Sequence, residues 1–83
     1  MTDDQIAREL ADYIVREIAP TPPAAPPGPD VPIIEQGLVD SLGLFKLIAF
    51  VEERLGVKIA PEEIVLENFA TIAAIVKLIQ SRR

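Results

Sequence analysis

The spacing of apolar residues near the start of the chain predicts a first helix. Between residues 3 and 18, apolar positions recur every three or four residues, which places them on one helical face. Thr2 and Gln5 have the spacing of a capping box at the start of this segment. The apolar positions are Ile6, Leu10, Tyr13, Ile14 and Ile18. We therefore expect a helix over residues 3–18.

A proline-rich segment follows. Seven of the eight prolines lie between Pro20 and Pro32, and proline both lacks a backbone N–H and fixes φ. We expect residues 20–40 to form a long, partly polyproline-like loop. Such a segment can bind an aromatic groove, but no basic residues flank Pro22–Pro26, so we favour a stiff connection. Apolar residues that we expect to fasten its end to the core are Ile33, Ile34, Leu38 and Val39.

The most apolar stretch of the chain predicts a second helix over residues 41–55. Gly56 suits the position just beyond its end, where a left-handed backbone is common. On this helix the apolar residues form two stripes, whereas a helix at the rim of a small bundle needs one. The first stripe comprises Leu44, Leu47, Ile48, Val51 and Leu55, and the second comprises Leu42, Phe45 and Ala49. From spacing alone we slightly favour cover of both stripes by neighbouring elements; the alternative is a docking surface.

Two further helices are expected in the last third of the chain. Proline followed by two acids predicts a brief helix over Pro61–Leu66, and we expect its apolar residues 64–66 to pack inward. Residues 68–69 are expected to form a connection. Thr71 is a suitable N-cap for a final, one-sided helix that ends at the basic Arg82–Arg83.

Together these elements predict an all-α fold. It is a small bundle of three main helices plus one short helix, with a long loop between the first and second helices. We expect one domain over residues 1–83. The expected core is Ile6, Leu10, Ile14, Leu47, Ile48, Val51, Leu55, Ile64, Phe69, Ile72, Ile75, Val76 and Ile79.

Composition argues against an enzyme. The 83 residues include no cysteine and no histidine, which removes the thiol nucleophile, the usual general base at neutral pH and the commonest transition-metal ligands. A net charge of −5, spread in ones and twos, disfavours nucleic acid as a partner. The start of the chain has no leader pattern, and no apolar run approaches the roughly 20 residues that span a bilayer. We expect a cytoplasmic monomer without membrane insertion.

Ser41 is the candidate site residue. In Asp40-Ser41-Leu42 it stands at the tip of the second helix, where the helix dipole favours a phosphoryl group although Asp40 opposes it. The alternative is that Ser41 only caps the helix. Lys46 lies about 140° around the helix, so Ser41 is not a self-activated nucleophile. The acidic pairs Glu52-Glu53 and Glu62-Glu63 are expected on solvated faces.

The ordered set of motifs resembles the acyl and peptidyl carrier proteins that bear 4′-phosphopantetheine. The set comprises a leading helix, a long loop, Asp40-Ser41-Leu42, Glu52-Glu53, Gly56-Val57-Lys58-Ile59, a short helix and Asn68-Phe69-Ala70-Thr71-Ile72. The resemblance implies that a phosphopantetheinyl transferase attaches the arm of coenzyme A to Ser41. The thiol of that arm would hold acyl or aminoacyl groups as thioesters. The absence of cysteine agrees with this, because the working thiol arrives with the cofactor.

The resemblance also implies which residues meet partner enzymes. These are Asp40, Leu42, Phe45, Lys46, Ala49, Glu52 and Glu53. Gly43 and Lys46 stand where fatty-acid carriers usually have acids, so we expect a free-standing carrier of a specialised pathway rather than of fatty acid biosynthesis. Its partners would be an acyl or amino-acid ligase and acyl-processing enzymes. The alternative is a non-catalytic helical protein–protein interaction module in which Ser41 acts only as a helix cap.

Overall fold

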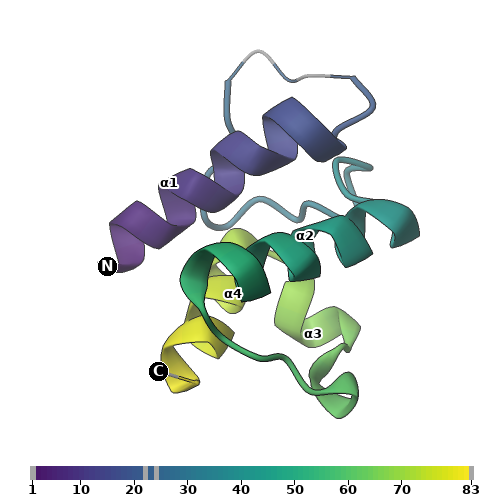
Figure 1. The fold of residues 1–83 in the computed structure, drawn as a ribbon. Helices are drawn as coiled ribbons and strands as arrows, with labels where there is room; N and C mark the ends of the chain where they lie inside the picture. The colour runs from purple at the N-terminus through teal and green to yellow at the C-terminus, as the bar shows by residue number, and fades with distance from the viewer. Residues whose placement is uncertain (1, 22, 24, 83) are drawn as a thin grey trace.

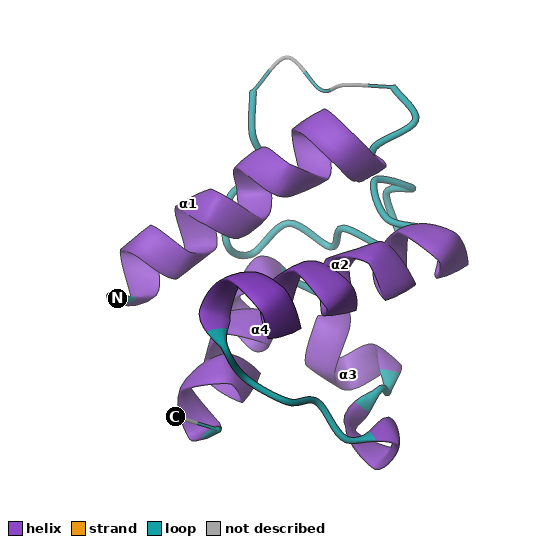
Figure 2. Ribbon diagram, viewed as in Figure 1, coloured by secondary structure: helices purple, strands orange, loops and turns teal. Residues whose placement is uncertain are grey.

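A computed structural model describes residues 2–21, 23 and 25–82 (Figure 1). All regular elements in these ranges are helical, and none is a strand (Figure 2). They are α1 (Asp3–Tyr13), the π-helical turn η1 (Ile14–Ile18), α2 (Ser41–Leu55), the 3-10 turn η2 (Pro61–Glu63), α3 (Leu66–Phe69) and α4 (Ile72–Ser81). The predicted all-α bundle, with a long loop between its first and second helices, is confirmed.

The first helix extends over the predicted residues but changes its winding. At its start the capping box is present: the Gln5 N–H donates to Thr2 Oγ1 at 3.2 Å, and the Thr2 N–H donates to Gln5 Oε1 at 2.9 Å. At its end the Ala19 N–H donates to the Ile14 carbonyl, five residues back, at 2.7 Å. This wide bond makes the last turn a π turn, which the apolar spacing did not predict.

Helix α2 has the predicted bounds. Gly56 ends it in the left-handed conformation, with φ of 69°. In Figure 1, α2 runs opposite to α1, so the end of η1 and the start of α2 lie on the same side of the molecule. The Ser41 end of α2 is therefore next to η1.

The short helix lies later in the chain than predicted. Instead of one helix over 61–66, the backbone forms η2 and then α3, which includes the expected connection at residues 68–69. Glu63 closes η2 because its Oε1 accepts from the Ala60 N–H at 2.9 Å, and its carbonyl accepts from Asn68 Nδ2 at 2.8 Å. Phe69 is fully buried, which holds the α3 turn against the core.

Apolar residues from every part of the chain form the core. The predicted core residues are buried, except that Ile64 is only partly buried. Five further residues join them: Ala11, Ile33, Val39, Val57 and Ile59. The end of the loop is fastened as expected, because Ile33 and Val39 are buried and Ile34 and Leu38 pack against the core. Two backbone hydrogen bonds add to this: the Ile33 N–H donates to the Ala70 carbonyl at 3.1 Å, and the Ala73 N–H donates to the Pro29 carbonyl at 2.9 Å. Pro22 and Ala24 of its polyproline-like part lie outside the described residues.

The last helix begins as predicted. Thr71 Oγ1 accepts a hydrogen bond from the Ala74 N–H at 3.1 Å, so Thr71 is the N-cap of α4. At the other end, Arg82 forms an ion pair with Glu63, which ties the end of the chain to η2. The loop, η2 and α4 are thus joined around the core, and α2 is left with one face toward solvent.

Candidate functional site

Ser41 is the first residue of α2, and its side chain is exposed. Asp40 is the N-cap: its Oδ1 accepts a hydrogen bond from the Gly43 N–H at 2.7 Å. None of the side-chain hydrogen bonds among the described residues involves the Ser41 hydroxyl. The hypothesis that Ser41 acts as the helix cap is therefore wrong, because Asp40 has this role. The Ser41 hydroxyl is accessible at the helix tip.

The second apolar stripe of α2 begins beside Ser41 and lies open. Leu42 is 76% exposed, Phe45 is 63% exposed and Ala49 is also exposed. The interpretation that neighbouring elements cover both stripes is therefore wrong. The cause is orientation, because the first stripe points to the core and its Leu47 and Val51 are fully buried. The second stripe is an uncovered apolar surface next to the candidate hydroxyl.

Charged residues around this stripe are sparse. Lys46 is exposed and forms no ion pair with a described residue. The residues one turn from it on α2 are all uncharged: Leu42, Gly43, Ala49 and Phe50. Between Ser41 and Val51, the outer face of α2 therefore presents a single positive charge among apolar side chains.

In each of the two acidic pairs, one glutamate is exposed and the other is half-buried. Glu53 is exposed as expected, but Glu52 is half-buried, and its Oε2 accepts from the Ile59 N–H at 3.1 Å. Glu62 is exposed, whereas Glu63 is half-buried and bonded within η2. The prediction of solvated faces is thus wrong for Glu52 and Glu63, which satisfy the backbone N–H groups of Ile59 and Ala60.

A second apolar surface flanks Ser41 on its other side. Val65 and Leu66, predicted to pack inward, are 43% and 65% exposed. They border an open groove of about 460 Å³ between the start of α2, the end of the loop and α3. Its lining residues are Ile34, Gly37, Val39, Asp40, Ser41, Leu44, Ile64, Val65 and Leu66. The sequence analysis missed this side of the site, because the apolar run Ile64-Val65-Leu66 was expected to pack inward.

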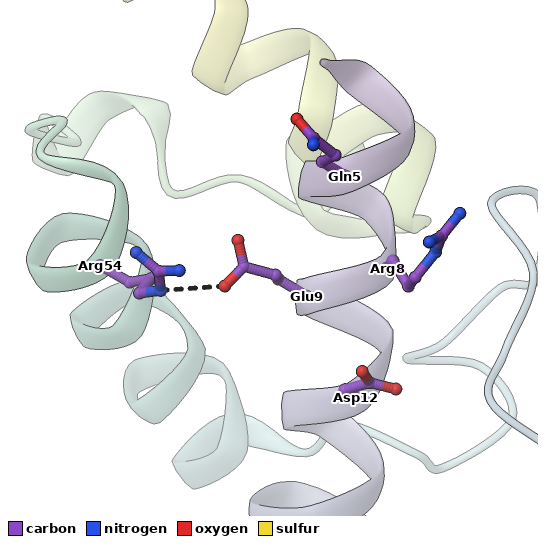
Figure 3. Close-up of a pocket in the computed structure, with 5 residues that line it drawn as sticks. All are labelled: Gln5, Arg8, Glu9, Asp12 and Arg54. Atoms are coloured by element: carbon purple, nitrogen blue, oxygen red, sulfur yellow. Dashed lines mark ion pairs between the residues drawn. The ribbon is translucent and has the colours of Figure 1, made fainter. Parts of the chain in front are cut away.

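A separate polar hollow lies between α1 and the far end of α2 (Figure 3). In Figure 3, Glu9 and Arg54 point toward one another, and Arg54 Nε lies 2.9 Å from Glu9 Oε1. Arg54 is about 20 Å along the helix from Ser41. Gln5, Arg8 and Asp12 also line the hollow, but in the described part of the chain no three His, Cys, Asp or Glu side chains could together hold a metal ion. The hollow is an ion-paired contact between two helices.

The residues at the tip of α2 fit an esterified phosphopantetheine. The Ser41 hydroxyl is exposed, the positive end of the helix dipole faces it, and a groove adjoins it. The Asp40 carboxylate is directed to the Gly43 N–H, which reduces its repulsion of a phosphodiester. The chain has no histidine that could deprotonate this hydroxyl.

Comparison with known proteins agrees with this geometry. Residues 8–79 match the family described as "Phosphopantetheine attachment site". Over 49 residues, the chain is 39% identical to "Probable acyl carrier protein PigG" from Serratia sp. (strain ATCC 39006). That alignment covers 59% of this chain and 56% of the relative, so it spans just over half of each. Among the described residues, no helix is long and apolar enough to cross a membrane.

Proposed function

The chain belongs to the phosphopantetheine attachment-site family, whose members are carrier proteins with covalently bound 4′-phosphopantetheine, and we propose that Ser41 holds this group. The observation that carries the proposal is the exposed hydroxyl of Ser41 at the first residue of α2. Because Asp40 caps the helix, Ser41 is free of that structural role. Its hydroxyl can therefore be esterified without loss of the cap.

A separate phosphopantetheinyl transferase carries out the attachment. The Ser41 Oγ forms a bond to the coenzyme A phosphorus that bears pantetheine, and the pyrophosphate P–O bond breaks. The adenosine 3′,5′-bisphosphate leaves with the electron pair, and the hydroxyl proton passes to a base of the transferase. When bound, the group supplies a thiol that holds an acyl or aminoacyl cargo as a thioester. The chain itself binds and presents the cargo, and its partners catalyse the reactions.

The exposed stripe of α2 is the proposed contact surface for these partners. Leu42, Phe45 and Ala49 offer apolar area beside Ser41, as docking surfaces do. The proposed rim of the surface is Asp40, Lys46, Glu52 and Glu53. Glu52 contributes less than the others because it is half-buried and bonded to Ile59. We therefore expect each partner to have an apolar hollow on its surface that accommodates the stripe.

Lys46 bears on the choice of partners and pathway. It is the only charged residue on α2 before Glu52, so a partner with a carboxylate opposite Lys46 complements this surface. We place the chain in a specialised pathway, served by its own acyl or amino-acid ligase, rather than in fatty acid biosynthesis. The similarity to a protein named as a probable acyl carrier protein supports an acyl cargo over an aminoacyl one.

Intact-mass analysis tests the attachment. The apo-protein is incubated with coenzyme A and a promiscuous phosphopantetheinyl transferase, and the wild type should gain the mass of one phosphopantetheine. Ser41→Ala should gain nothing. Ser81→Ala is the matched control because Ser81, at the end of α4, is the other serine of the chain and should be dispensable. The proposal fails if a reference carrier is modified while the wild type is not, or if Ser41→Ala still gains the mass.

A further inference from the structure

Gly43 occupies a crowded position in the first turn of α2. It is buried, and a Cβ at this position would lie 2.5 Å from Ile18 Cγ2 and 3.2 Å from Asp40 Oδ1. Carbon atoms in contact are normally separated by about 3.5–4.0 Å, so no side chain fits between Ile18 and the α2 backbone. Val39 Cγ1 lies 3.7 Å away and closes a third side. Gly43 thus permits Ile18 to lie close to the α2 backbone, two residues after Ser41.

The π turn of η1 brings Ile18 to this position. The bond from the Ala19 N–H to the Ile14 carbonyl widens the last turn, which changes the direction of Ile18 relative to a regular α-helix. Among the helical elements, η1 is the one whose backbone lies alongside α2 most extensively (Figure 1). Elsewhere, longer side chains bridge α1 and α2: the Glu9–Arg54 ion pair and the stacked rings of Tyr13 and Phe50, whose centroids are 4.1 Å apart.

We propose that Gly43 is a positioning residue for the modification of Ser41. The absence of a side chain lets Ile18 pack against the first turn of α2, and this contact holds the Asp40 cap and the Ser41 hydroxyl in one place. Gly43 also donates the N–H that Asp40 binds, so the contact and the cap meet at one residue. The inference rests on the proposed function, because it assumes that Ser41 is the residue that the transferase modifies.

Gly43→Ala tests the inference in steady-state transfer from coenzyme A by the promiscuous transferase. The added methyl group displaces Ile18 or the Asp40 cap, so kcat should fall about tenfold to a hundredfold, as is typical of a reacting group displaced by about 1 Å. KM should stay close to the wild-type value, because the outer surface of α2 is unchanged. Alanine favours helix more than glycine does, so a weaker helix cannot explain a slower reaction.

Two further variants separate positioning from loss of stability. Ile18→Ala removes the methyl group that would collide with the added Cβ. The double variant Ile18→Ala/Gly43→Ala should therefore have the same kcat as Ile18→Ala alone. Val76→Ala is the control for stability. Val76 is buried in α4 and lines a hollow with Asp3 and Asp4 at the start of α1, so its truncation should lower the melting temperature without changing kcat.

The possible outcomes are distinct. An unmodified wild type refutes the proposed function itself. If the wild type is modified, three results refute the positioning role: an unchanged kcat in Gly43→Ala, a change confined to KM, or an equal loss of kcat in the Ile18→Ala background. Circular dichroism shows whether each variant folds. If Gly43→Ala alone is unfolded, Ile18→Ala decides, because it removes the same contact: a lower kcat with an unchanged KM supports the role, and the wild-type kcat refutes it.

Discussion

The two stripes of α2 are both apolar, but their environments are opposite. Leu47 belongs to the first stripe and is fully buried, whereas Leu42 belongs to the second and is 76% exposed. The two leucines lie five residues apart on one helix, or about 140° around its axis. The first stripe has five apolar side chains and the second has three. They differ in whether the covering surface belongs to this chain.

The contrast shows what hydrophobic patterning can establish. It measures how much apolar area a helix offers, but it does not say which molecule covers that area. For the first stripe the cover is the core of this chain. For the second, the adjacent Ser41 and the family assignment favour partner enzymes. A stripe left open beside the proposed attachment site suits a carrier that binds its partners transiently.

Truncation in the buried stripe should have the largest effect on stability. Leu47→Ala should lower the free energy of unfolding by about 2–5 kcal/mol, because it removes buried methyl groups and leaves a cavity. Urea denaturation followed by circular dichroism measures the change. The folded fraction should still accept phosphopantetheine, since Leu47 does not reach the outer surface. A loss below about 0.5 kcal/mol, the range of ordinary surface positions, would show that the site is not core.

The adjacent acids Glu52 and Glu53 extend the comparison to polar side chains. Glu52→Ala removes the acceptor for the half-buried Ile59 N–H and should cost about 1–3 kcal/mol. Glu53→Ala is the matched control on the exposed side of the helix, and it should change stability by less than about 0.5 kcal/mol. Urea denaturation of the two variants measures the difference. Equal effects would mean that the Glu52 hydrogen bond adds nothing to stability.

The cap of α2 should have a smaller effect. Asp40→Ala removes the acceptor for the Gly43 N–H and should cost about 0.5–2 kcal/mol. Asp40→Asn keeps an oxygen in the same place and should restore most of this loss, because asparagine is an equally good N-cap. Thermal unfolding compares the two variants. If Asp40→Asn were as unstable as Asp40→Ala, charge rather than capping geometry would be the source of the stabilisation.

The elements of the fold differ in how far the sequence could predict them. The bounds of α2 were predictable because the cap at Asp40 and the turn at Gly56 are local signals. The shift of α3 was not, because it depends on side-chain bonds of Glu63 and on the burial of Phe69. The π turn of η1 was not predictable either, because the spacing of apolar residues does not show that the Ala19 N–H bonds to the Ile14 carbonyl, five residues back.

The candidate site divides in the same way. The position of Ser41 at the tip of a helix followed from sequence, and so did the composition of the second stripe. The exposure of that stripe did not, because spacing cannot show which elements lie opposite it. The groove formed with Val65 and Leu66 was missed because their exposure follows from the tertiary position of α3.

Leu42→Ala should have the smallest effect on stability and is the sharpest test of the contrast. It makes the same chemical change as Leu47→Ala but in the open stripe, so the free energy of unfolding should change by less than about 0.5 kcal/mol. If the stripe contacts partners, the same variant should raise the KM of the phosphopantetheinyl transferase for the carrier and leave kcat near the wild-type value. Urea denaturation and initial rates provide the two measurements. A stable variant with an unchanged KM would mean that the transferase does not use Leu42. A destabilised variant would mean that the stripe is covered within the chain itself.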